Sequence, residues 1–167
     1  MELRRRKKIR LENYDYGRTG YYFVTICVKD KHNILWEPRR LSEMCVGAAC
    51  GRPRLSNIGQ VVDREIQKLN DIYPAVKVNK YVVMPNHVHL LLCILPSNSG
   101  RPQAAPTLPR IINQFKGAVT KSVGYSVWQK SYHDHVIRNE ADYLRIWQYI
   151  DTNPAKWRED CYYEEGL

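Results

Sequence analysis

The stretch that decides the fold is K-Y-V-V-M-P-N-H-V-H-L-L-L-C-I-L, residues 80 to 95. Two apolar runs flank Pro85 and Asn86, and this pattern predicts two strands joined by a tight turn. The second run begins with two histidines that stand one residue apart. Residues i and i+2 of a strand point to the same face of a sheet. We therefore expect His87 and His89 to project side by side from one surface, as two ligands of one metal ion do.

The apolar periodicity of the remaining chain predicts strands and helices in a definite order. Runs of β-branched and aromatic residues indicate strands, and apolar residues spaced by three and four indicate amphipathic helices. The order is strand, helix, strand, strand, helix, strand, helix. It favours an α+β fold of ferredoxin-like type, with a central antiparallel sheet and packed helices. The expected strands are Tyr21–Val28, Val76–Met84, His87–Leu95 and Trp128–Ile137, with a minor strand near Leu41 or Val46; the expected helices span residues 57–72, 108–123 and 139–150.

The length of 167 residues suits a single domain over residues 1–167. Residues 1–18 are expected to form a basic N-terminal arm, because six Lys and Arg residues stand between positions 4 and 10. Residues 97–106 are poor in apolar side chains and are expected to form a mobile loop. No pattern assigns a structure to the tail, residues 156–167.

The charge balance indicates an anionic partner. The chain has 26 Lys and Arg against 17 Asp and Glu, which gives a net charge of +9. Nucleic acid is the commonest partner of such a chain, and a basic arm often lies along phosphates. The alternative is a basic surface that serves only solubility.

The cysteine pattern and the absence of long apolar runs favour a cytoplasmic protein. The five cysteines are odd in number and show no C-x-x-C spacing, which is typical of a reduced compartment. The N-terminus is basic but lacks the apolar segment of a signal peptide. No run approaches the length of a membrane span, so we expect no membrane contact.

A single H-x-H pair is weak evidence for a metal site, and the chain has a second pair, His133 and His135. Either pair can also be polar residues on an exposed strand. The third predicted helix bears on the choice, because Arg145, Tyr149 and Asn153 are spaced by four and share one helical face. The guanidinium of Arg145, the phenol of Tyr149 and the carboxamide of Asn153 are thus expected along one edge of this helix. The alternative is a packed aromatic residue followed by an Asn-Pro helix terminator.

At this point the chain resembles the HUH single-tyrosine transposases, and in particular the REP-associated tyrosine transposases. The resemblance covers most of the chain. The combination of M-P-N-H-V-H with a downstream Y-I-x-x-N-P is far more specific than either part. The matching stretches are R-R-K-K-I-R-L-E-N-Y-D-Y, Y-F-V-T-I-C, V-V-M-P-N-H-V-H-L-L-L, Q-F-K-G-A-V-T-K, W-Q-K-S-Y-H-D-H-V-I-R-N-E-A-D-Y and Y-I-D-T-N-P.

The resemblance implies a metal-dependent endonuclease and strand transferase that acts on single-stranded DNA beside a hairpin. His87 and His89 would hold a divalent ion, Mg2+ or Mn2+, and Tyr149 would be the nucleophile that forms a covalent 5′-phosphotyrosine. Insertion-sequence transposases place a glutamine ligand four residues after the tyrosine. This chain has Asn153 there, which matches the REP-associated branch and makes Asn153 the expected third ligand.

The resemblance also implies contacts with DNA beyond the metal site. Tyr14, Tyr16 and Trp128 are candidates for stacking on bases, and His133 and His135 are interpreted as structural or DNA-facing. Relatives include monomers and dimers, so a homodimer stays open. The rival hypotheses are an inert nucleic-acid-binding domain and a zinc protein built on the His-x-His pair. The candidate DNA-binding residues are Arg4, Arg5, Arg6, Lys7, Lys8, Arg10, Lys116, Lys121 and Arg145.

Overall fold

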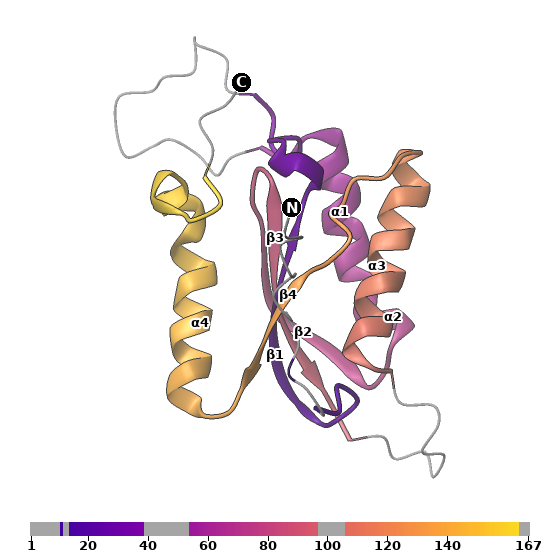
Figure 1. Ribbon diagram of the computed structural model, residues 1–167, viewed down its shortest axis with the longest axis vertical. Helices are drawn as coiled ribbons and strands as arrows, with labels where there is room; N and C mark the ends of the chain where they lie inside the picture. The colour runs from indigo at the N-terminus through magenta and orange to yellow at the C-terminus, as the bar shows by residue number, and fades with distance from the viewer. Residues whose placement is uncertain (1–10, 12–13, 39–53, 97–105, 164–167) are drawn as a thin grey trace, which may run out of the picture.

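The computed structural model describes residues 11, 14–38, 54–96 and 106–163. It consists of three layers: the helix α4 lies on one face of a central sheet, and α1, α2 and α3 lie on the other (Figure 1). The described elements are β1 (Gly20–Cys27), the 3-10 turn η1 (Lys29–Lys31), α1 (Asn57–Gln67), α2 (Leu69–Ile72), β2 (Val76–Val83), β3 (His87–Ile94), α3 (Leu108–Val123), β4 (His133–Ile137), α4 (Glu140–Thr152) and the 3-10 turn η4 (Asn153–Glu159).

The sheet has the strand order β2-β3-β1-β4, and every neighbouring pair is antiparallel. This order and the sequence of elements from β1 to β4 are those of the ferredoxin-like βαββαβ arrangement, so the predicted fold class is confirmed. The strand β3 is central, and its register places His87 opposite Cys27 and His89 opposite Thr25 of β1. The histidine pair therefore lies in the middle of the sheet.

Two apolar layers enclose the sheet, and β3 contributes to both. Alternate residues of a strand point to opposite faces. Leu90 and Leu92 face the larger core under α1 and α3, whereas Leu91 packs with Ile146 and Ile150 of α4. All eight residues of β3 are consequently buried. The face that carries Leu91 also carries His87 and His89, so both histidines belong to the α4 side.

Local sequence signals set the ends of the helices. The Ser56 hydroxyl accepts a hydrogen bond from the Gly59 N–H and caps α1, as Asn139 caps α4. Gly124 ends α3 with φ of 89°, a conformation that glycine adopts without strain. The helix predicted over residues 57–72 is divided at Lys68 into α1 and α2, which corrects its length.

The fourth strand is shorter than its sequence pattern predicts. It begins at His133, while Trp128 makes only an isolated bridge with Val28. The ammonium group of Lys116 donates hydrogen bonds to the backbone carbonyls of Gln129 and Lys130, at 2.6 and 3.0 Å. These carbonyls are therefore used outside the sheet, and the pairing of this segment with β1 is limited to the bridge at Trp128, where the Gln129 N–H donates to the Cys27 carbonyl at 3.0 Å.

Some expectations fall on residues that the structure does not describe. These are the minor strand near Leu41 or Val46, residues 1–10 of the basic arm, and residues 97–105 of the loop. Tyr16 and Trp128 are buried, and Tyr14 packs against the Tyr16 ring, so the prediction that Tyr16 and Trp128 stack on DNA bases is wrong. Within the described ranges, no helix has both the length and the apolar character needed to cross a membrane.

Candidate active site

The turn before β3 and the alternation of that strand bring two imidazoles together, with ring centroids 4.4 Å apart and ring planes inclined at 67°. The backbone N–H of Met84 donates to the His87 carbonyl at 2.8 Å, which closes the predicted Pro-Asn turn. The Nε2 atoms of His87 and His89 lie 2.9 Å apart. Both side chains are at most 1% exposed. Two ring nitrogens at this separation point to one place, where a cation can be held between them.

The opposite nitrogen of each imidazole is held by a neighbouring side chain. The His87 Nδ1 lies 2.9 Å from Asn86 Oδ1, and the His89 Nδ1 lies 2.9 Å from Thr25 Oγ1. The Asn86 amide nitrogen donates to the carbonyls of Lys31 and Tyr162, which fixes the amide oxygen towards His87. Because an amide oxygen only accepts, the His87 Nδ1 carries the proton and its Nε2 keeps a lone pair. Metal-binding histidines are oriented in this way.

Burial keeps both histidines uncharged. It lowers the pKa of His87 to about 4, although the Asp160 carboxylate opposes this effect. Burial, followed by repulsion from His87, holds the pKa of His89 well below its usual value. Neutral imidazoles are the form that binds metal ions, since protonation removes the ligand lone pair. The pair is thus ready to bind a cation at neutral pH.

Tyr149 comes from α4 and joins the same cluster. Its hydroxyl lies 3.2 Å from His89 Nε2 and donates to Asp160 Oδ2 at 3.1 Å. The Phe23 ring packs edge-on against it at 6.1 Å and stacks on His89 at 5.1 Å. Burial, followed by the charge of Asp160, raises the pKa of the phenol. Tyr149 is therefore a neutral hydroxyl that reaches His89 of its own chain.

Contacts between α4 and β2 fix the position of this tyrosine. The Lys80 ammonium forms an ion pair with Asp151 at 2.6 Å and lies 4.4 Å from the centre of the Trp147 ring. The Asn79 amide donates to the Tyr143 hydroxyl at 3.1 Å. Together with the apolar layer under α4, these contacts anchor both ends of the helix to the sheet.

The expected ligand Asn153 lies in the cluster and is 3% exposed. Its amide nitrogen donates to Asp160 Oδ2 at 2.8 Å. Its amide oxygen is buried and has no hydrogen-bond partner among the described residues. A buried polar atom without a partner is costly, and a bound cation would satisfy it. The Asn153 amide oxygen is thus available at the cluster. The role of Asn153 as a metal ligand stays a prediction.

Asp160 is the site residue that sequence reasoning missed. One carboxylate oxygen accepts from Tyr149 and Asn153, and the other accepts from the backbone N–H of Tyr162 at 2.7 Å. Ligand atoms of His87, His89 and Asp160 lie within 4.8 Å of one another, so these three residues could hold a metal ion. Two neutral nitrogens and a carboxylate fit a divalent cation.

The segment that carries Asp160 has no periodic pattern, because it follows η4 and belongs to neither a long helix nor a strand. The Tyr162 ring lies 4.6 Å from the His87 ring and closes that side of the pair. Burial raises the pKa of Tyr162 to about 12. The only sequence signal was a carboxylate eleven residues after the tyrosine. Because α4 ends at Thr152, its helical periodicity does not extend to this carboxylate.

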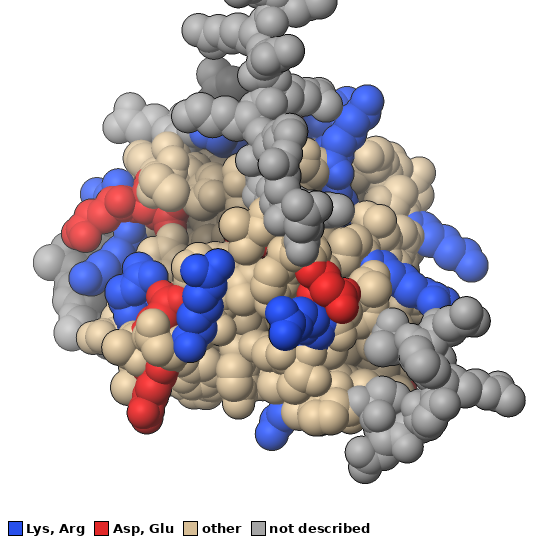
Figure 2. Space-filling model, turned by 60° about the horizontal axis from the view of Figure 1, so that its bottom comes forward, with Lys and Arg blue, Asp and Glu red and all other residues tan. Residues whose placement is uncertain are grey.

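The three candidate DNA-binding residues that the structure describes do not gather around the site. Lys116 and Lys121 belong to α3 on the opposite side of the sheet (Figure 1), and the Lys116 ammonium is used by backbone carbonyls. The six basic residues of the arm lie outside the described ranges. Figure 2 shows lysines and arginines scattered among acidic side chains on the face that it presents. Arg145 alone among the described candidates comes from α4.

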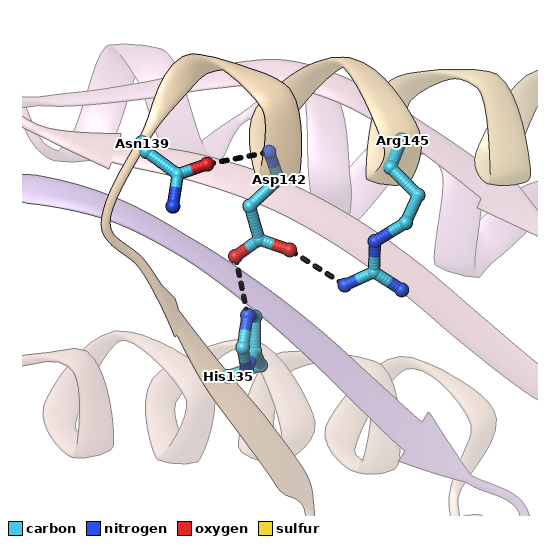
Figure 3. Close-up of polar contacts among 4 residues, drawn as sticks. All are labelled: His135, Asn139, Asp142 and Arg145. Atoms are coloured by element: carbon cyan, nitrogen blue, oxygen red, sulfur yellow. Dashed lines mark hydrogen bonds and ion pairs between the residues drawn. The ribbon is translucent and has the colours of Figure 1, made fainter.

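The second histidine pair lies on the edge strand β4, and both side chains are exposed. His133 pairs with Thr25 and His135 with Phe23, so both share the sheet face of His89. The His135 Nε2 lies 2.6 Å from Asp142 Oδ2, and Arg145 donates to the other oxygen of Asp142 at 2.6 Å (Figure 3). His135 and Arg145 are thus joined through one carboxylate in the first turns of α4.

Sequence similarity to known proteins identifies the family of the chain. No family model matches it. An uncharacterised protein of Haemophilus influenzae is 32% identical over 178 aligned residues, which cover 95% of this chain and 93% of the relative. A second protein of Haemophilus influenzae, provisionally named a REP-associated tyrosine transposase, is 30% identical over 87% of this chain and 77% of its own length. The chain belongs to the REP-associated tyrosine transposase family.

Two further similarities agree with this family. A REP-associated tyrosine transposase of Escherichia coli is 32% identical over 48% of this chain and 45% of its own length. A solved structure of a REP-associated tyrosine transposase bound to a REP hairpin is 22% identical, with a TM-score of 0.58 over 89% of this chain and 73% of the other. At that identity the likeness concerns the fold, and it agrees with the ferredoxin-like arrangement. The family predicted from the sequence is thus confirmed.

Proposed function

We propose that this member of the REP-associated tyrosine transposase family is a metal-dependent endonuclease and strand transferase that acts on single-stranded DNA beside hairpins, as one domain in the cytoplasm. One observation carries the proposal: the Tyr149 hydroxyl lies 3.2 Å from Nε2 of a buried, neutral histidine pair. The relative of similar fold whose structure holds a REP hairpin supports hairpin DNA as the substrate class. The net charge of +9 favours the same partner.

The residues around the pair fit a resident divalent ion, Mg2+ or Mn2+. His87, His89 and Asp160 would hold it, and the unpartnered amide oxygen of Asn153 supports the predicted role of Asn153 as a further ligand. Oxygen donors beside two imidazoles leave open positions for a substrate. When bound, the ion supplies polarisation of the scissile phosphate and offsets the negative charge that develops there.

Tyr149 supplies the nucleophile. Its oxygen forms a bond to the phosphorus while the bond from phosphorus to the 3′ oxygen breaks, which leaves a 5′-phosphotyrosine and a 3′ hydroxyl. The phenol already donates to Asp160 Oδ2, so this carboxylate is placed to receive the proton, and the departing 3′ oxygen takes one from water. The phosphodiester energy is retained, so a second strand can be joined by the reverse reaction.

The arrangement favours a site that one chain completes. Tyr149, both histidines and Asp160 meet within a single copy of the protein. A homodimer is therefore not required to assemble the cluster, and we propose that the monomer is competent for cleavage.

The test uses a pool of DNA hairpins with randomised single-stranded flanks, labelled at the 3′ end and incubated with Mg2+ or Mn2+. We expect a labelled protein adduct that survives denaturation, and its loss by at least about a hundredfold in Tyr149→Phe, because phenylalanine has no nucleophilic oxygen. Tyr125→Phe is the matched control, since Tyr125 is 53% exposed and lies just beyond α3. This control should keep full adduct formation.

Two other outcomes would replace the proposal. Binding of the pool without an adduct in any metal indicates an inert nucleic-acid-binding domain. Tight stoichiometric zinc after purification, with no cleavage, indicates a zinc protein, since two histidines and a carboxylate also suit that ion.

A further inference from the structure

Part of the sheet face that carries the site extends beyond α4. The helix lies over β2 and β3, with the polar anchors to β2 described above. On the neighbouring strands, Tyr21 of β1 is 40% exposed, and His133 and His135 of β4 are also exposed. Residues directly opposite in an antiparallel pair share a face. Tyr21 pairs with Ile137 and Thr25 with His133, so these side chains lie on the face of His89.

At one end of this face, a cleft of about 360 Å³ lies between the start of β1, the end of β4 and the first turn of α4. The rings of Tyr21 and Tyr143 meet edge-to-face at 5.0 Å on one side of it. Ile137, which is 8% exposed, adds an apolar surface. The complete lining is Tyr21, Ile137, Arg138, Asn139, Glu140 and Tyr143.

We propose that this cleft binds one unpaired nucleobase of the DNA strand, a site separate from the metal cluster. Aromatic rings bind any base by stacking, and apolar walls favour the flat ring over water. Glu140 repels phosphate but accepts hydrogen bonds from the amino groups of a base edge. Arg138 offers the complementary contact for a neighbouring phosphate. The charges therefore favour a base in the cleft and the backbone beside it.

The position of the cleft suits a strand that continues from Tyr149, and in this respect the inference rests on the proposed function. Tyr21 precedes Thr25 by four residues of β1, which corresponds to about 13 Å along a strand. That is roughly the span of four stacked nucleotides at 3.4 Å each. Phe23 lies between them and packs against both His89 and Tyr149. An aromatic row thus leads from the cleft to the nucleophile.

The test is photocrosslinking with single-stranded oligonucleotides that carry 5-iododeoxyuridine, performed with the full chain in EDTA so that no cleavage occurs. We expect crosslinked peptides to contain Tyr21 or Tyr143 when mapped by mass spectrometry. The Tyr21→Ser substitution should weaken binding of the same oligonucleotides about tenfold and remove the Tyr21 crosslink, as expected for the loss of one base stack. Tyr125→Ser is the matched exposed control and should bind as the unmodified protein does.

Crosslinks confined to residues outside the cleft, or unchanged affinity in a folded Tyr21→Ser protein, overturn the inference. Arg138→Gln provides a second test and leaves the residues of β1 unchanged. This substitution should reduce the affinity for the oligonucleotides and make that affinity depend less steeply on salt concentration. Adduct formation is measured in parallel on the hairpin pool. Crosslinking at Tyr21 without an adduct contradicts the cleavage proposal alone, and an adduct without crosslinking at the cleft contradicts this inference alone.

Discussion

The Tyr149 hydroxyl and the His89 Nε2 lie 3.2 Å apart although sixty residues separate them in the chain. One belongs to a helix on the surface of the sheet and the other to its most buried strand. The contact depends on α4 being anchored to β2 and on the turn that starts β3. Changes at these supports should therefore alter metal binding and cleavage together.

Asp160→Asn should weaken Mn2+ binding by at least about tenfold and lower the rate of adduct formation by a larger factor. The substitution keeps the size of the side chain but removes the negative charge beside both histidines and the acceptor of the Tyr149 proton. Calorimetric titration with Mn2+ gives the affinity, and the labelled hairpin pool gives the rate. Asp71→Asn on the exposed side of α2 is the control, and an equal loss there would contradict the assignment.

Asn86→Ala should reduce metal affinity by about 10- to 100-fold even though Asn86 is not an expected ligand, since outer partners of metal-binding histidines have effects of this size. The amide oxygen of Asn86 holds the His87 Nδ1, and its nitrogen binds the carbonyls of Lys31 and Tyr162. Asn70→Ala removes a comparable amide that accepts from the Val78 N–H away from the site. Unchanged Mn2+ affinity in a folded Asn86→Ala protein would contradict the orienting role.

Stability without metal should fall as the pH drops from about 6.5 to about 4. In this window the unfolded chain binds a proton at His87, whose ordinary pKa is about 6.5, whereas burial lowers the native pKa of His87 to about 4. The unfolded state then binds more protons, so the free energy of unfolding decreases with falling pH, by at most about 3 kcal/mol for this residue. Urea unfolding in EDTA measures the slope, and His87→Gln should reduce it. An identical slope in the two proteins would refute the shift.

Gly59→Ala should destabilise the protein by roughly 1–3 kcal/mol, whereas Gly117→Ala should be neutral or stabilise it by up to about 1 kcal/mol. Both glycines lie in helices. A methyl group at Gly59 would overlap the backbone carbonyl of Leu35, which cannot move without disturbing its hydrogen bond from Ser56. Nothing lies within 4 Å of the corresponding position at Gly117. Thermal unfolding of the two variants checks this prediction. The melting temperature should fall in Gly59→Ala and should stay the same or rise in Gly117→Ala.

Strong local patterns predicted most of the fold. The strand that carries His87 and His89 has a turn before it and an unbroken apolar run after it, and the caps at Ser56 and Asn139 mark helix starts. Trp128 misled the strand prediction because its apolar ring packs in the core beside Phe115 without joining the ladder. Burial and strand pairing are separate properties, and an apolar sequence pattern indicates mainly the first.

The candidate site was predicted only in part, because local sequence patterns position side chains on regular elements alone. His87 and Tyr149 lie on regular elements whose periodicity tells which face each side chain occupies. Asp160 lies after a 3-10 turn, and its direction is set by long-range hydrogen bonds with Tyr149 and Asn153. No local pattern encodes such contacts. The family resemblance directed attention to Asn153, and the three-dimensional arrangement added the carboxylate next to it.

The position of Asp160 also gives the site an order of assembly during synthesis. A ribosome that has produced the chain through Ile94 has added both histidines, but neither Tyr149 nor Asp160 yet exists. Translation at about 5–20 residues per second adds the remaining stretch to Asp160 several seconds later. A nascent chain can therefore begin to build the sheet around the imidazoles well before the cluster with Tyr149 and Asp160 is complete. The proposed cleavage activity would thus be acquired only after α4 and the segment beyond it have docked.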